Sequence, residues 1–101
     1  MGRRAAKVDA NQPDIVRRLR ALGITVASTA EVGNGFPDIA VGYQGRTFLY
    51  EIKDPAQAPS ARKLSPKEAD FHEEWGGHAK VVTTVSEILR DLSETLREDS
   101  A

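Results

Sequence analysis

The stretch GNGFPDIAVGYQGRTFLYEIKD, residues 33–54, decides the fold. Two runs of residues that are typical of strands, 38–43 and 46–53, stand on either side of Gln44-Gly45. A two-residue turn that ends in glycine indicates a β-hairpin here, because glycine tolerates the left-handed backbone that such a turn requires. The sequence therefore predicts two antiparallel strands joined by a tight turn.

The hairpin also predicts which residues face one another. With the turn at Gln44-Gly45, Tyr43 pairs with Arg46, and residues whose numbers sum to 89 are opposed. Asp38 is then predicted to lie opposite Glu51, with Cβ atoms about 4.5–5.5 Å apart. Two carboxylates at that separation repel each other unless a cation lies between them.

A hard divalent cation such as Mg²⁺ suits this pair, since it prefers oxygen ligands and keeps positions for water and phosphate. Lys53 points to the same side of its strand as Glu51, because side chains alternate along a strand, so it can reach a phosphate oxygen. The triplet alone also fits a surface sheet face in which Lys53 bridges Asp38 and Glu51. The predicted register, together with the glycine-proline loop at 33–37 where backbone can approach a ligand, favours a functional site.

Patterns on either side of the hairpin complete an α-β-β-β-α-β-α order. Apolar residues at helical spacing predict the helices, and short apolar runs predict the strands. Asp9 or Asn11 is expected to cap the first helix, and residues 54–63 are expected to form a basic loop. Besides the hairpin, the predicted elements are a helix over 12–22, a strand over 24–28, a helix from the capping box Ser65-Pro66-Lys67-Glu68 to about Trp75, a strand over 79–83 and a last helix capped by Ser86.

These elements predict a single α/β domain over residues 1–101, with a mixed sheet flanked by helices, a C-terminal helix and a loose basic arm at 1–8. The chain is 40% hydrophobic and 29% charged and has no cysteine, which excludes a disulfide scaffold and a thiolate metal site. No apolar run approaches the roughly 18 residues of a membrane span and no signal peptide is evident, so a soluble, cytoplasmic protein is expected. Residues 1–20 carry a net charge of +4 and residues 64–101 a net charge of −5, which permits a phosphate-facing basic end.

Three stretches resemble the PD-(D/E)XK nuclease superfamily. They are VDANQPDIVRRLRALG, the hairpin stretch quoted above and PSARKLSPKEADFHEEW, which together cover roughly residues 8–85. Within the superfamily, the chain is most similar to small phage and bacterial VRR-NUC proteins, which are related to archaeal-type Holliday junction resolvases. The resemblance implies a restriction-endonuclease-like αβββαβ core and a bacterial or phage-infected cell as the setting.

The resemblance also implies roles for the residues around the hairpin. Asp38 and Glu51 would bind Mg²⁺ or Mn²⁺, with the Ile52 carbonyl as a further ligand. Lys53 would position the attacking water or stabilise the charge that develops on the phosphate. Relatives often carry glutamine where Glu68 stands, which leaves the role of Glu68 open.

The family places a further site residue on its first helix. Asp9 is the leading candidate, resolvase-like spacing favours Gln12, and Asp14 is the third choice. Helix capping is the structural alternative for each of them, and for Asp9 it is equally well supported.

Basic side chains supply candidates for DNA contact. Arg62 and Lys63 follow the hairpin strands, Arg17 lies on the polar side of the first helix with Arg18 and Arg20, and Arg46 lies beside the hairpin turn. The resemblance also implies a homodimer. The candidates for its contact, which equally suit the core of the monomer, are Trp75, Leu89, Leu92 and Leu96.

These features predict a Mg²⁺-dependent, structure-selective DNA endonuclease that acts on branched or flapped DNA. Two alternatives remain open at this point. One is a non-catalytic DNA-binding or assembly module on the same fold, which has no need of two opposed carboxylates. The other is a metal-dependent phosphoesterase that acts on small nucleotides, for which the sequence lacks a deep nucleoside-binding signature.

Overall fold

The computed structural model describes residues 9–100, and the predicted arm at 1–8 lies outside them. The predicted order of helices and strands is confirmed, with ends that agree to within one or two residues. The expected loop at 54–63 differs, because it contains a short 3-10 helix. The elements are α1 (Gln12–Ala21), β1 (Thr25–Ser28), β2 (Ile39–Tyr43), β3 (Arg46–Ile52), the 3-10 helix η1 (Pro59–Arg62), α2 (Pro66–Glu74), β4 (Ala79–Val82) and α3 (Val85–Ser100).

The four strands form one mixed sheet in the order β1-β2-β3-β4. β2 is antiparallel to both β1 and β3, whereas β4 runs parallel to β3. Tyr43 pairs with Arg46, so the predicted register is confirmed. Both residues of the turn have positive φ, 54° and 75°, which is the left-handed pair that a two-residue hairpin turn needs.

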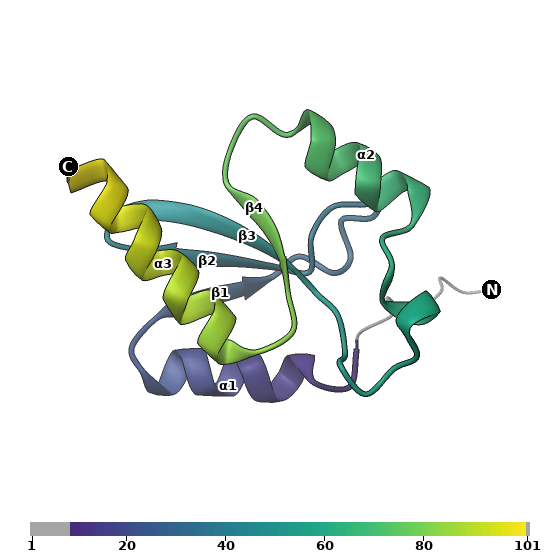
Figure 1. The fold of residues 1–101 in the computed structure, drawn as a ribbon. Helices are drawn as coiled ribbons and strands as arrows, with labels where there is room; N and C mark the ends of the chain where they lie inside the picture. Colours follow the sequence, from purple (N-terminus) through teal and green to yellow (C-terminus); the bar gives the residue numbers. More distant parts are fainter. Residues whose placement is uncertain (1–8, 101) are drawn as a thin grey trace.

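Helices α1 and α3 cover one face of this sheet, and α2 lies at the end of the sheet where the loop enters β2 (Figure 1). The helices pack their apolar stripes on the inward side chains of the strands, and each buried aliphatic or aromatic side chain contributes roughly 1.5–3 kcal/mol. The core residues are Ile15 and Leu19 from α1, Ile39, Val41, Phe48, Tyr50 and Ile52 from β2 and β3, and Ile88 and Leu92 from α3. Within residues 9–100, no helix has the length and apolar character needed to cross a membrane.

A buried polar cluster fastens α3 to the sheet. The Tyr50 hydroxyl donates a hydrogen bond of 2.6 Å to Asp91 Oδ2, and His78 Nε2 lies 2.6 Å from the same oxygen. Lys80 Nζ lies 3.3 Å from the other oxygen, Oδ1. Burial alone would raise the pKa of Asp91, but the hydrogen bonds from Tyr50 and His78 hold it below its usual range. The carboxylate is therefore ionised and fully engaged in holding the fold.

The predicted helix caps need correction. Helix α3 is capped by Thr84, whose hydroxyl accepts the Glu87 backbone N–H at 3.2 Å, so the prediction of Ser86 as the cap is wrong. Glu87 Oε1 accepts the Thr84 backbone N–H in return, which completes a capping box two residues earlier than expected. Asn11 occupies the N-cap position of α1, but its side chain makes no capping hydrogen bond, and Asp9 lies outside that position.

The candidates for core or dimer contact differ in how deeply the structure buries them. Leu92 is 2% exposed and belongs to the core, with Leu89 partly buried against it. Trp75 is 44% exposed at the end of α2, where its ring stacks on Phe71 with centroids 4.8 Å apart. Its ring also meets Phe36 of the loop before β2 edge to face, with centroids 6.0 Å apart, so Trp75 joins a surface aromatic cluster and does not enter the core.

Gly35 sets the distance between the loop before β2 and the start of α2. Its φ is +82°, and a Cβ built there would lie 2.3 Å from the Lys67 carbonyl oxygen. Only glycine allows this backbone conformation and this close approach together. The first turn of α2, which carries Glu68, is thereby held against the loop that leads to Asp38.

We expect Gly35→Ala to destabilise the protein more than Gly33→Ala. Both glycines have φ of +82°, but a Cβ at Gly33 would meet open space. Each substitution should cost about 1–2 kcal/mol in backbone strain. Gly35→Ala should lose roughly 1–3 kcal/mol more through the contact with Lys67. Denaturant unfolding of both variants measures the difference, and equal losses would show that the close approach is unimportant.

Candidate active site

The Asp38 carboxylate is fixed at the point where β2 meets the end of β3. The Asp38 backbone N–H donates to the Tyr50 carbonyl at 2.9 Å, and the Asp38 carbonyl accepts the Thr29 N–H at 2.8 Å. Its carboxylate oxygen Oδ2 accepts the Ile52 backbone N–H at 2.7 Å. Because Ile52 directly follows Glu51, this bond places the two carboxylates side by side, as the register predicts.

Glu51 projects from β3 into a site where little water reaches it. The residue is 3% exposed, and its Oε1 atom is buried without a hydrogen-bond partner. Burial, followed by the charges of Asp38 and Glu68, raises the pKa of Glu51 to about 9. Burial likewise raises the pKa of Asp38, and the hydrogen bond from Ile52 offsets only part of that effect. The pair therefore holds a proton, or another positive charge, more tightly than isolated carboxylates do.

Lys53 supplies the positive charge that the structure shows beside this pair. Its Nζ atom lies 3.4 Å from Glu51 Oε2 and 3.0 Å from Glu68 Oε1. Burial alone would lower the pKa of Lys53, but the hydrogen bond to Glu68 and the charges of Glu51 and Glu68 outweigh it and raise that pKa. Lys53 is therefore an ammonium at neutral pH.

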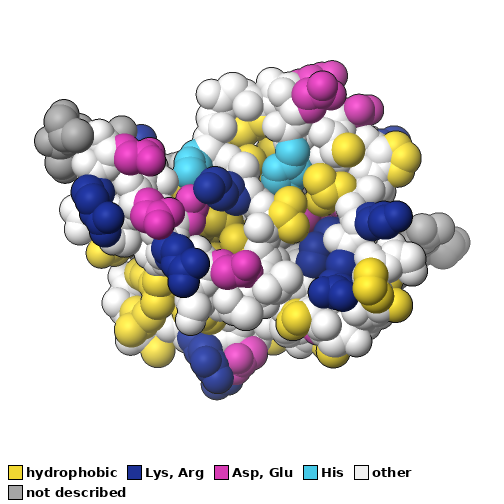
Figure 2. Space-filling view, viewed as in Figure 1, with side chains coloured by type: hydrophobic (Ala, Val, Ile, Leu, Met, Phe, Trp, Pro, Cys, Tyr) yellow, Lys and Arg dark blue, Asp and Glu magenta, His cyan; other side chains and the backbone are white. Residues whose placement is uncertain are grey.

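These groups line a pocket of about 390 Å³ between the sheet, η1 and α2. The charged side chains along its wall are Asp9, Asp38, Glu51, Lys53, Lys63 and Glu68. On the face of the molecule in Figure 2, Lys and Arg side chains gather at the right, over the segment that joins β3 to α2, whereas acids and bases are mixed over α3. A polyanion approaching the pocket from that segment would meet positive charge first.

The structure distinguishes the three candidates from the first helix. Asp9 lines the pocket, and its negative charge contributes to the raised pKa of Asp38. Gln12 is buried at 5% exposure in the first turn of α1, and it lines a different hollow beside Val16. Asp14 forms ion pairs on the surface of α1 with Arg17 and Arg18. Of the three, Asp9 is the one that the fold brings to the pocket.

The candidates for DNA contact also differ in whether they lie near the pocket. Lys63 lines the pocket, and Arg62 is exposed in η1 beside it. Arg17 is paired with Asp14, on α1. Arg46 lies at the hairpin end of β3, the end opposite to Asp38. Lys63 and Arg62 are therefore the basic side chains placed to meet a phosphate at this pocket.

Asn11 contributes to the site in a way that the sequence did not indicate. Its side-chain amide donates to the Lys53 carbonyl and to the Thr83 carbonyl, each at 3.1 Å. One side chain thereby ties the start of α1 to the ends of both β3 and β4. The amide donates to these two carbonyls and does not cap α1. The prediction of Asn11 as a capping side chain, which relied on capping propensity, therefore missed this role.

The pocket offers two ligands of the kind that a hard divalent cation prefers. Two carboxylates converge there, and the buried Oε1 of Glu51 lacks a partner that a cation would supply. Among residues 9–100, no three or more acidic, histidine or cysteine side chains gather into a group that could hold a metal. A cation at Asp38 and Glu51 would therefore take most of its other ligands from water, backbone or substrate, as Mg²⁺ commonly does.

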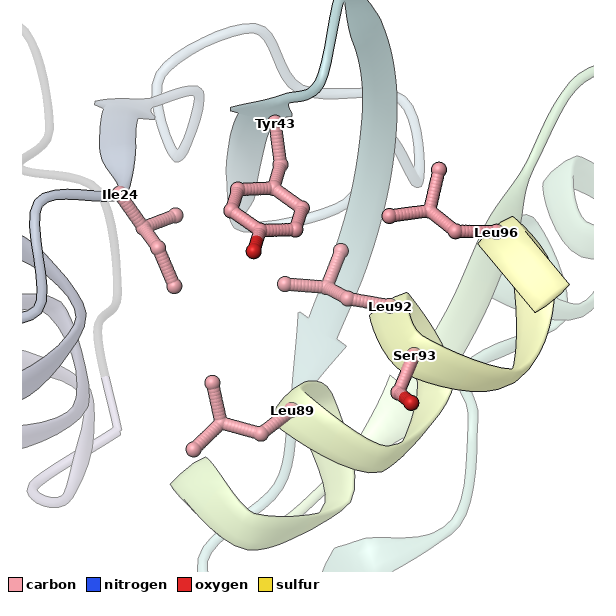
Figure 3. A pocket seen from close by; sticks show the side chains of 6 residues that line it. All are labelled: Ile24, Tyr43, Leu89, Leu92, Ser93 and Leu96. Atoms are coloured by element: carbon pink, nitrogen blue, oxygen red, sulfur yellow. The ribbon is translucent and has the colours of Figure 1, made fainter.

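A second pocket has a different chemical character. It measures about 250 Å³ and lies between α3 and the ends of β1 and β2. Figure 3 shows apolar side chains directed toward it, with the hydroxyls of Tyr43 and Ser93 as its polar groups; the other side chains are Ile24, Leu89, Leu92 and Leu96. Its lining includes no carboxylate and no basic side chain, in contrast to the pocket that holds Asp38, Glu51 and Lys53.

No protein-family model matches the sequence, and no curated protein and no solved structure matches it. The geometry of the pocket and the sequence motif are therefore the observations that bear on function.

We expect Glu51→Gln to remove part of the pH dependence of stability in the presence of EDTA. The unfolded chain ionises Glu51 near its ordinary pKa of 4.5, whereas the pKa in the folded protein is about 9. The folded state thus keeps a proton that the unfolded state has lost, so stability should fall as pH rises from about 4.5 to 9. Glutamine cannot ionise, and the variant should show a shallower fall.

Thermal unfolding of the wild type and of Glu51→Gln between pH 5 and pH 9 measures this difference. The two proteins have the same carboxylates except for Glu51. Asp14→Asn provides the control, because Asp14 is a half-buried surface carboxylate outside the pocket. If both variants follow the wild-type curve, the buried position of Glu51 does not control its ionisation.

Proposed function

We propose that the protein is a Mg²⁺- or Mn²⁺-dependent DNA endonuclease. The observation that carries the proposal is the juxtaposition of the Asp38 and Glu51 carboxylates with the Lys53 ammonium on one open pocket. The order of these residues along the hairpin is also the basis of the resemblance to the PD-(D/E)XK superfamily. Each of these residues is costly to bury without a partner, which argues for a use beyond folding.

In this mechanism Asp38, Glu51 and the Ile52 carbonyl would hold the cation. When bound, the cation would polarise the phosphodiester and lower the pKa of the attacking water. The Lys53 ammonium would donate hydrogen bonds to that water or to the phosphate oxygens, where negative charge develops as the phosphodiester is hydrolysed. Asp9, on the rim of the pocket, adds negative charge near Asp38 and thereby favours a cation there.

The geometry favours an enzyme over a binding module. A module that only binds DNA gains nothing from holding two carboxylates together, since both repel phosphate. It also favours a polymeric substrate over a small nucleotide. The residues that line the pocket include no aromatic side chain on which a base could stack.

The substrate class and assembly are part of the same proposal. We propose a homodimer with two active sites that acts on branched or flapped DNA, as the resemblance to the resolvases suggests. Cleavage of linear, flapped, splayed and four-way DNA, with Mg²⁺ or Mn²⁺ against EDTA, ranks these substrates directly.

Asp38→Asn, Glu51→Gln and Lys53→Ala should each abolish cleavage while the protein stays folded. The first two remove negative charge from the cation, so they should also weaken Mg²⁺ binding in calorimetry. Asp14→Asn serves as the matched control, because it removes a carboxylate from the surface of α1 and should retain activity. Retained cleavage in all three pocket variants would place the chemistry elsewhere and refute the proposal.

DNA binding should weaken as salt increases, because phosphate contacts release counterions. Lys63→Ala and Arg62→Ala should each reduce the slope of log affinity against log salt by about one, without a change in base preference. Arg97→Ala, on α3, controls for the general loss of positive charge. A binding constant that is independent of salt would instead favour the small-nucleotide alternative.

A further inference from the structure

The ammonium of Lys53 has two carboxylate partners, and they come from different elements. Glu51 lies two residues away on the same strand, whereas Glu68 reaches the site from α2, and the Glu68 contact is the shorter of the two at 3.0 Å against 3.4 Å. The Lys53 side chain is 12% exposed and that of Glu68 is 22% exposed. The contact is therefore mostly withdrawn from water, where an ion pair is stronger than on an open surface.

Glu68 is itself held by the backbone of its helix. Its Oε1 atom, the same atom that meets Lys53, accepts the Ser65 backbone N–H at 2.9 Å, and Ser65 Oγ accepts the Glu68 N–H at 3.2 Å. The close approach of Gly35 to Lys67 fixes this turn against the loop before β2. A lysine side chain has four rotatable bonds, and a fixed acceptor at its end removes much of that freedom.

Glu51 cannot serve Lys53 in the same way if it also holds a cation. A cation beside Glu51 would compete with the ammonium for the same carboxylate and would repel it. Glu68 also lies beside Glu51, and its charge contributes to the raised pKa of Glu51. Its described ion pair is with Lys53, so its carboxylate remains available to Lys53 when Glu51 holds a cation. The two glutamates therefore have different partners to satisfy.

We infer that Glu68 is a positioning residue for the reaction, which holds the Lys53 ammonium at the pocket while Glu51 is left for the cation. The inference rests on the proposed nuclease function, but the contact itself can be tested without any cleavage. The positioning role also explains why a glutamate stands at position 68, where an unpaired carboxylate would repel DNA.

The test compares Glu68→Ala with Glu87→Ala. Glu87 makes the same reciprocal capping box with Thr84 at the start of α3, so both variants lose a capping glutamate. No lysine contact is described for Glu87. The Lys53 ammonium is observed directly through its ¹⁵N signal, and its order parameter should fall in Glu68→Ala and stay at the wild-type value in Glu87→Ala.

Kinetics give the second measurement. Glu68→Ala should lower kcat on DNA by on the order of 10–100-fold, with KM changed little, because a misplaced group near the reacting atoms affects the transition state most. Glu87→Ala should lower the melting temperature at least as much, because Glu87 Oε1 also accepts from the backbone N–H and the hydroxyl of Thr83, but it should leave kcat near wild type. Glu68→Gln keeps a side chain that a capping box accepts, so it tests the charge if Glu68→Ala does not fold. Its kcat should fall between those of the wild type and the alanine variant.

The outcomes separate the two proposals. An unchanged Lys53 order parameter in both Glu68 variants would overturn the positioning role, whether or not the protein cleaves DNA. Equal losses of kcat in Glu68→Ala and Glu87→Ala would overturn it as well, because they would reflect capping alone. A wild-type protein that cleaves no DNA, but whose Lys53 signal loses order only in the Glu68 variants, would overturn the nuclease proposal and leave the contact established.

Discussion

Two carboxylates, half-buried Asp38 and buried Glu51, lie side by side, and the other charged groups of the site offset the electrostatic cost of this pair. An ionised carboxylate in a buried position loses hydration, and a second one beside it adds repulsion. The raised pKa of each group expresses the same cost, since both hold protons more tightly than they would in water. A cation bound between them would replace the proton and relieve the repulsion.

The fold accommodates this cost because its apolar core is made of residues that do not line the pocket. One face of the sheet carries the apolar core with α1 and α3, and the Asp91 cluster ties α3 to β3 and β4. The pocket is built from the loop before β2, the end of β3 and the start of α2. Its geometry depends on a few specific contacts: the Ile52 N–H to Asp38, the Asn11 amide to two strand ends, and the close approach at Gly35. The apolar core and the wall of the pocket therefore use different residues.

Local sequence rules were sufficient for the hairpin and insufficient for the contacts between elements. The turn at Gln44-Gly45 fixes the register, so the proximity of Asp38 and Glu51 followed from counting residues. The capping box at Ser65 likewise needs only four neighbouring residues. Asn11, by contrast, satisfies carbonyls that lie 42 and 72 residues away, and the partner of Glu68 is 15 residues away on another element. Such partners depend on how helices pack, which short-range patterns do not encode. For the same reason, the sequence alone does not decide which residue near the first helix reaches the pocket, and the fold shows that it is Asp9.

The charge of the pocket wall also bears on how DNA would reach it. When ionised, Asp9, Asp38, Glu51 and Glu68 supply four negative charges, against two positive charges from Lys53 and Lys63. At neutral pH the raised pKa of Glu51 keeps a proton there, which leaves an excess of one negative charge that would repel a phosphate. A divalent cation that displaces this proton would supply the two positive charges that balance the wall. Under the proposed function, phosphate affinity at the pocket should therefore depend on the cation, while Lys63 and Arg62 would attract DNA with or without it. The basic side chains would bring DNA to the pocket, and the cation would decide whether a phosphate enters it. The acidic wall would then make phosphate entry conditional on the metal, as the proposed metal-dependent nuclease would require.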